Sequence, residues 1–135
     1  MNLRPELAGL SEFAVVVNAQ NLPGLESAVT SELKQEGMRV RATAPVTLGI
    51  LIEYQENAAC PDLTAVQVNV SLSQNVRLLR GRRSVNHEVT FVQEREAFLA
   101  PRKEAADRSQ QMVLDLVRYL CESSRYATAT LREKK

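Results

Sequence analysis

The sequence contains few of the residues from which common functional sites are built. It has no tryptophan, an aromatic content of 4%, one histidine (His87) and two cysteines (Cys60 and Cys121). Because neither cysteine lies near His87 and no second histidine exists, a metal site is difficult to assemble. The chain also lacks a G-x-S-x-G, P-loop or dinucleotide-binding pattern. We therefore expect a protein that is not an enzyme, with no catalytic residues, no cofactor and no metal.

Charge and hydropathy exclude two further classes. The formal net charge of the 135-residue chain is +1, whereas strong non-specific binding to nucleic acid needs a large positive field. Residues 13–17 are apolar but form a run of five, far short of the roughly 18 residues of a membrane span. The start, Met1-Asn2-Leu3-Arg4, lacks the apolar stretch of a signal peptide. Two alternatives stay open: a cytoplasmic protein, or one whose targeting segment is not in this sequence.

The three isolated reactive side chains are expected to be structural. His87 shares its position parity with Val85 and Val89, which places it on the inward face of a strand, partly buried and hydrogen-bonded. Cys60 lies in a predicted loop and Cys121 near the end of a predicted helix. Their spacing matches no metal or redox motif, so we expect two free thiols, and a single disulfide is the open alternative.

Hydrophobic periodicity predicts the first half of the fold. A valine-rich strand is predicted at Glu12–Asn18 and a helix over residues 21–37, with Gly37 suited to a left-handed cap. One face of that helix is apolar, and its residues are Leu22, Leu25, Val29 and Leu33. A second strand is predicted in two pieces, residues 38–43 and 46–54, because Pro45 cannot donate to a β-ladder.

A long hairpin with strict alternation is the clearest pattern of the second half. Gly81 supplies the residue that a tight turn needs. Successive strand residues point to opposite faces, so apolar positions are predicted to face a core: Val66, Val68, Val70, Leu72, Val76, Leu78, Val85, Val89 and Phe91. The opposite face is polar and largely uncharged, and four of its residues are the predicted partner-binding surface: Gln67, Asn69, Ser71 and Ser73.

The last predicted element is a helix that starts at Pro101. Its apolar residues recur at helical spacing, and they are Ala105, Ser109, Met112, Val113, Leu116, Val117 and Leu120. The order strand–helix–strand–strand–strand–helix predicts an α+β fold, a two-layer sandwich in which two helices cover one face of a four-stranded sheet. We expect a single domain over residues 1–123 and a polar, disordered tail over residues 124–135.

Basic residues gather at two places. Arg77, Arg80, Arg82 and Arg83 surround the hairpin turn, where guanidinium forks can bind phosphate. The alternative is a solvated tip that keeps the strand edge soluble. Arg102 and Lys103 form a smaller basic spot at the start of the last helix.

Two carboxylates on the return strand are the remaining candidates for chemistry. Glu94 and Glu96 share one face of that strand, and paired carboxylates can serve acid/base catalysis. Because no pocket is indicated around them, we expect a solvated face instead.

The element order and several phrases of the sequence resemble the lipopolysaccharide-assembly lipoprotein family LptE. The resemblance covers roughly residues 3–120. The phrases that carry it are Leu3-Arg4, Phe13-Ala14-Val15-Val16-Val17, Glu36-Gly37-Met38-Arg39-Val40, Ala44-Pro45-Val46-Thr47-Leu48-Gly49-Ile50-Leu51, and the helix from Leu99-Ala100 through Lys103-Glu104-Ala105 and Asp115-Leu116-Val117 to Leu120.

The resemblance implies a non-catalytic outer-membrane lipoprotein on the periplasmic side. Its members bind lipopolysaccharide, and they plug and help to assemble the β-barrel LptD. The family's basic position near the start of the last helix corresponds to Lys103, with Arg102 adjacent, whereas its basic position between the second and third strands has no counterpart in residues 57–63. Membrane contact is expected only through a lipidated cysteine that this sequence does not contain. Charge reversal at Arg102 and Lys103 is predicted to weaken lipopolysaccharide binding.

Two other functions stay open. An accessory lipoprotein of another envelope lipid-transport (ABC) system has a comparable α+β layout. A cytoplasmic RNA- or nucleotide-binding sandwich could use the arginines of the hairpin turn, but RNA-binding sheets stack bases on exposed aromatic side chains, and the polar face here has none.

Overall fold

The structure, a computed structural model, describes residues 4–20, 22–56 and 58–133. Expectations that fall on residues 1–3, 21, 57 and 134–135, including Leu3 of the first family phrase, lie outside this part of the chain. The elements are a short 3-10 helix η1 (Pro5–Leu7), β1 (Glu12–Asn18), α1 (Leu25–Gln35), β2 (Arg39–Val40), β3 (Val46–Glu56), β4 (Leu63–Arg80), β5 (Arg83–Pro101) and α2 (Ala105–Glu133).

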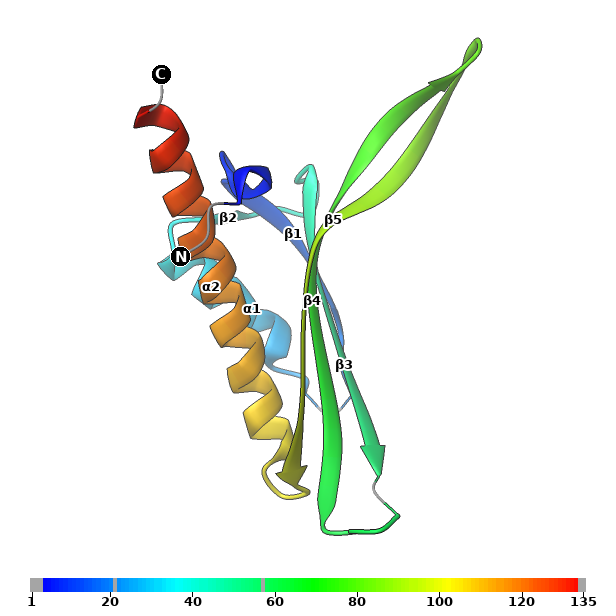
Figure 1. Cartoon of the computed structure of the whole chain (residues 1–135), viewed down its shortest axis with the longest axis vertical. Helices are drawn as coiled ribbons and strands as arrows, with labels where there is room; N and C mark the ends of the chain where they lie inside the picture. The colour runs from blue at the N-terminus through cyan, green and yellow to red at the C-terminus, as the bar shows by residue number, and fades with distance from the viewer. Residues whose placement is uncertain (1–3, 21, 57, 134–135) are drawn as a thin grey trace.

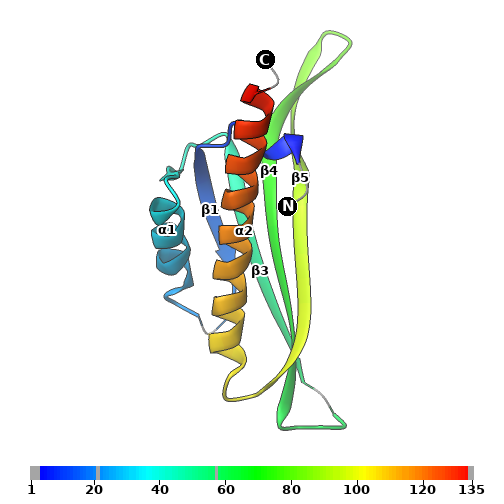
Figure 2. The ribbon, with the colours of Figure 1, turned by 60° about the vertical axis from the view of Figure 1, so that its left-hand side comes forward.

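One mixed sheet and one helical layer form the fold. The strand order is β2-β1-β3-β4-β5; β1 runs parallel to β2 and β3, and the other pairs are antiparallel. Both α1 and α2 lie against the same face of the sheet (Figures 1 and 2). The α+β class with two helices on one face is confirmed, but the described sheet has five strands, so the prediction of four is wrong.

The extra strand comes from the segment predicted as one strand in two pieces. These pieces are separate strands on opposite sides of β1. The backbone N–H groups of Arg39 and Arg41 donate to the carbonyls of Ser11 and Phe13, both at 2.9 Å, which attaches β2 to one edge of β1. A turn closed by the Ala44 N–H on the Arg41 carbonyl at 3.1 Å then leads through Pro45 to β3 on the other edge.

Helix α1 forms where the sequence predicts it. Leu25, Val29 and Leu33 are buried, as expected of its apolar face. Gly37 has φ of +84°, and the N–H of Met38 donates to the Leu33 carbonyl at 2.9 Å, which is the hydrogen bond of a Schellman cap. The cap turns the chain back toward β2.

The core lies between the helices and alternate residues of the two central strands. Leu48, Ile50 and Ile52 of β3 are buried there, and the matching residues of β4 are Val66, Val68, Val70 and Leu72. Helix α2 supplies Val113, Val117, Leu120 and Cys121. The predicted alternation is therefore confirmed for the part of the hairpin that the helices cover.

Helix α2 differs from the prediction at both ends. Pro101 ends β5 instead of starting the helix, which begins at Ala105 after a turn. The helix continues to Glu133, so a disordered tail from residue 124 is wrong for residues 124–133. The Ser124 hydroxyl donates to the Leu7 carbonyl at 2.7 Å, and Ala127 is fully buried, because these small residues let η1 pack closely on the helix.

The end of the hairpin, residues 74–90, extends beyond the helical layer and is called the distal hairpin below. Leu78, Val85 and Val89, predicted to face the core, are 42%, 44% and 39% exposed, and His87 is exposed as well. Leu72 pairs with Val92 but Ser73 pairs with Thr90, so Phe91 is an extra residue on β5. A bulge of this kind bends a strand pair, and the distal hairpin turns away from the helices (Figure 1).

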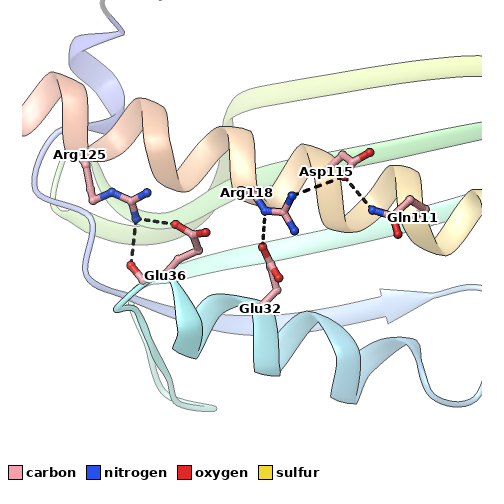
Figure 3. Close-up of polar contacts among 6 residues, drawn as sticks. All are labelled: Glu32, Glu36, Gln111, Asp115, Arg118 and Arg125. Atoms are coloured by element: carbon pink, nitrogen blue, oxygen red, sulfur yellow. Dashed lines mark hydrogen bonds and ion pairs between the residues drawn. The ribbon is translucent and has the colours of Figure 1, made fainter.

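Two arginines of α2 join the helices. The Arg118 Nε lies 2.8 Å from a Glu32 carboxylate oxygen, and the Arg125 Nη1 lies 2.7 Å from Glu36 (Figure 3). Glu32 is only 7% exposed, so its charge needs this partner. The pair raises the pKa of Arg118, because hydrogen bonding to the Glu32 carboxylate favours the charged guanidinium.

Loss of that partner should weaken the helical layer. We expect Arg118→Ala to lower the free energy of unfolding by clearly more than the loss of an exposed ion pair does, because it leaves the buried Glu32 carboxylate unpaired. The matched control is Arg108→Ala, which breaks an exposed i,i+4 pair with Glu104 on the same helix and should cost about 0.3–0.5 kcal/mol. Urea denaturation measures both, and equal losses would contradict the assignment.

Candidate functional site

The six basic residues predicted to bind a ligand lie in two groups at opposite ends of the hairpin. Arg80 pairs with Arg83 at the turn, whereas Leu63, at the other end of β4, pairs with Pro101, next to Arg102. At roughly 3.3 Å per residue the 18-residue strand spans about 60 Å. The two groups are therefore separate sites (Figure 1).

The group at Arg102 and Lys103 lies in the turn between β5 and α2. The Arg102 Nη2 is 3.2 Å from a carboxylate oxygen of Glu56, and both side chains are exposed. Glu104 follows directly and pairs with Arg108 at 3.4 Å. Because these carboxylates offset the positive charge of the turn, its electrostatic attraction for an anion is weak.

The turn of the distal hairpin concentrates unpaired positive charge. Gly81, with φ of +61°, allows the tight turn. Because Arg80 and Arg83 are direct cross-strand partners, their side chains leave the same face of the hairpin. Arg77, Arg80, Arg82 and Arg83 are exposed, and no carboxylate pairs with any of them within the described residues.

Aliphatic side chains accompany those arginines. Leu78 lies directly opposite Val85, and Val89 lies on the same face of the hairpin. Leu79 leaves the other face and is 78% exposed. The distal hairpin therefore combines guanidinium groups with apolar surface, which suits a ligand that carries both anionic and apolar parts. Sequence reasoning missed this apolar surface, because it assigned Leu78, Val85 and Val89 to the core.

The sheet face that carries no helix is the second candidate surface, called the open face below. Gln67 is exposed, and Asn69 and Ser71 are half-buried. Ser73, predicted to be on this surface, is only 6% exposed at the bulge, so it is not available to a partner. Gly49 lies at the centre of the face, where an added Cβ would be 3.0 Å from the Ser71 Oγ, and this leaves the surface shallow.

The open face also carries apolar residues, of which sequence reasoning missed Val16 and Leu99. Val16 and Leu99 are 57% and 55% exposed, and Leu51 is half-buried between Asn18 and Asn69. Strand alternation could have identified these residues, because each occupies an outward-facing position on its strand. A groove of about 560 Å³ runs across β3, β4 and β5, and its outward-facing lining residues are Glu53, Gln55, Ala65, Gln67, Ala97 and Leu99.

The remaining predicted residues do not converge on a reactive centre. Among the described residues, no group of three or more histidine, cysteine, aspartate or glutamate side chains is arranged to hold a metal ion. Glu94 pairs with Arg4, whereas Glu96 is exposed. No described helix has both the length and the apolar character needed to cross a membrane.

Comparisons with known proteins identify no family. No protein-family model matches the chain, and no curated protein matches it significantly in sequence. Among solved structures, a crystal structure of a minor lipoprotein from Acinetobacter baumannii aligns with 91% of this chain and 94% of its own length, at 13% identity and a TM-score of 0.33. At that score the comparison assigns neither fold nor function.

The two cysteines are free and lie in contrasting environments. Cys60 is exposed, and Cys121 is buried in α2. Burial raises the pKa of the Cys121 thiol from its ordinary value of 9.0 to about 12, and the nearby charge of Glu36 acts in the same direction. The folded protein thus keeps this thiol neutral and unreactive at neutral pH.

This burial predicts a pH dependence of stability. Above about pH 9 the unfolded chain ionises its thiol while the folded protein does not, so stability present at lower pH is lost as the pH rises toward 12. We expect unfolding free energies measured in urea to fall more steeply above pH 9 for the wild type than for Cys121→Ala. Cys60→Ala should keep the wild-type slope. Equal slopes in all three proteins would exclude the proposed linkage.

Proposed function

We propose that this chain is a non-catalytic envelope lipoprotein that binds lipopolysaccharide through its distal hairpin and acts as a plug and assembly partner of the β-barrel LptD at the periplasmic side of the outer membrane. The observation that carries the proposal is the group of four unpaired, exposed arginines beside exposed leucine and valine side chains. The family resemblance of the sequence motivates the choice of ligand and barrel.

The chemistry of lipopolysaccharide matches the two components of this surface. Its lipid portion carries phosphate groups next to acyl chains. A guanidinium fork can bind a phosphate through two hydrogen bonds, and Arg80 and Arg83 leave the same face of the hairpin. The aliphatic pair Leu78 and Val85 lies two residues further from the turn on each strand, on the same face, where it can contact an acyl chain.

The open face supports the role as a plug. Gln67, Asn69 and Ser71 offer amide and hydroxyl groups without formal charge, and Gly49 keeps the surface low. The interior of a large β-barrel is polar, so the amides and hydroxyls of this face can exchange water for barrel side chains, and its two charged residues, Glu53 and Arg95, can pair with charged side chains of the barrel.

Charge reversal tests the ligand site. We expect Arg80→Glu/Arg83→Glu to weaken binding to purified lipopolysaccharide by at least about ten-fold, because each charge-assisted contact contributes roughly 1.5–3 kcal/mol. Arg102→Glu/Lys103→Glu should have a smaller effect, since Arg102 already pairs with Glu56. Fluorescence titration measures both. Unchanged affinity in the hairpin variant would remove these arginines from the site.

Co-purification tests the plug. We expect tagged LptD to retain the wild-type chain and to lose Ser71→Arg, because the direct cross-strand partners of Ser71 are Gly49 and Gln93 and the new charge would be buried against the barrel without a carboxylate opposite it. Ser31→Arg, which places the same charge on the exposed side of α1, should be retained like the wild type. Retention of both variants would show that the open face does not enter the barrel.

The same pull-down separates the other envelope function. Co-purification with an ABC transporter in place of LptD would assign the chain to a different lipid-transport system. For the nucleic-acid alternative, the discriminating result is a salt-dependent electrophoretic mobility shift of RNA that is lost in the variant Arg80→Ala/Arg82→Ala.

A further inference from the structure

We propose that the distal hairpin docks on bilayer surfaces rich in anionic phospholipid, without any need for lipopolysaccharide. The proposal goes beyond the function above, because it describes a direct and reversible membrane contact by the folded chain. It also departs from the expectation that membrane contact occurs only through a lipid anchor.

The geometry makes this segment accessible to a flat surface. The distal hairpin projects past the helical layer and bends away from it at the Leu72–Ser73 irregularity (Figure 1). All its residues except Val76 are exposed. A bilayer can therefore meet the hairpin without first displacing either helix.

The side chains of one face are arranged as an interfacial segment requires. Leu78, Val85 and Val89 share that face, and Arg80 and Arg83 end it at the turn. In an interfacial amphipathic segment, apolar side chains enter the boundary with the acyl chains while cations stay at the phosphates. On the other face, Leu79 adds apolar contact at the turn.

Charge complementarity selects an anionic bilayer. Four arginines against one glutamate, Glu88, give residues 74–90 a net charge of +3 in a chain whose net charge is +1. Basic residues held near an anionic membrane surface each strengthen binding by roughly five-fold. The positive charge is thus concentrated on the segment that also exposes aliphatic side chains.

Other occupants fit this surface less well. Residues 74–90 contain no phenylalanine, tyrosine or tryptophan on which a nucleic-acid base could stack, and His87 supplies their one aromatic ring. A second copy would bring two strongly positive turns together. The hairpin also cannot span the hydrocarbon, because the open edges of two strands would leave backbone groups unpaired there; it lies in the headgroup region instead.

Vesicle co-sedimentation of the full chain tests the proposal. The vesicles are phosphatidylcholine alone and phosphatidylcholine with about a third of phosphatidylglycerol, both free of lipopolysaccharide. We expect binding only to the anionic vesicles, weakened by salt. Arg80→Ala/Arg83→Ala should lower the partition coefficient by at least about ten-fold, and so should Leu78→Ser/Val85→Ser, which leaves the charge unchanged.

The matched control is Arg102→Ala/Lys103→Ala, which removes the same charge at the far end of the hairpin strands and should change binding by less than about two-fold. Circular dichroism confirms that each variant is folded. Equal binding to both vesicles, an equal loss in the control, or an RNA shift without vesicle binding would overturn the proposal.

Lipopolysaccharide binding without binding to anionic vesicles would overturn this proposal and leave the proposed function standing. Binding to anionic vesicles without lipopolysaccharide binding would support the membrane proposal and would exclude lipopolysaccharide as the ligand of the proposed function.

Discussion

The packing of α2 on β4 sets the limits of this fold, because a helix and a strand cover different distances with the same number of residues. The 29 residues of α2 rise about 1.5 Å each, or about 43 Å in all. The 18 residues of β4 rise about 3.3 Å each, or about 60 Å. The strand is thus longer than the helix that covers it. What the helix covers becomes the core, and what it does not cover becomes exposed surface.

This difference in length explains which sequence predictions succeeded. Alternation predicted Val66, Val68, Val70 and Leu72 as core because a helix faces them. The same alternation continues through Leu78, Val85 and Val89, where no helix remains. A period of two reports which face a residue occupies, and it cannot report whether that face is covered. For the same reason His87 was wrongly expected to be partly buried.

Local chemistry was predicted well where neighbours in the sequence remain neighbours in space. The arginines around Gly81 stay together because a tight turn joins them, and the cap at Gly37 depends only on its own helix. The distance from these arginines to the second basic spot, Arg102 and Lys103, could not be predicted, since strand register decides it. The two-residue β2 is too short for any periodic signal. The end of α2 was missed because Ser124 and Ala127 lack apolar bulk, and their burial depends on η1 packing against them.

Charge is segregated along the same axis as burial. Outside residues 74–90 the chain has thirteen basic and fifteen acidic residues, a net charge of −2 against +3 on the distal hairpin. In the body, Arg118 and Arg125 are engaged by carboxylates of α1, whereas the arginines of the hairpin have none among the described residues. Such a separation gives the molecule a dipole, so an anionic surface attracts the hairpin and repels the body. This charge distribution orients the molecule relative to an anionic surface before any specific contact forms. An anionic partner therefore meets the distal hairpin first, and the open face stays free.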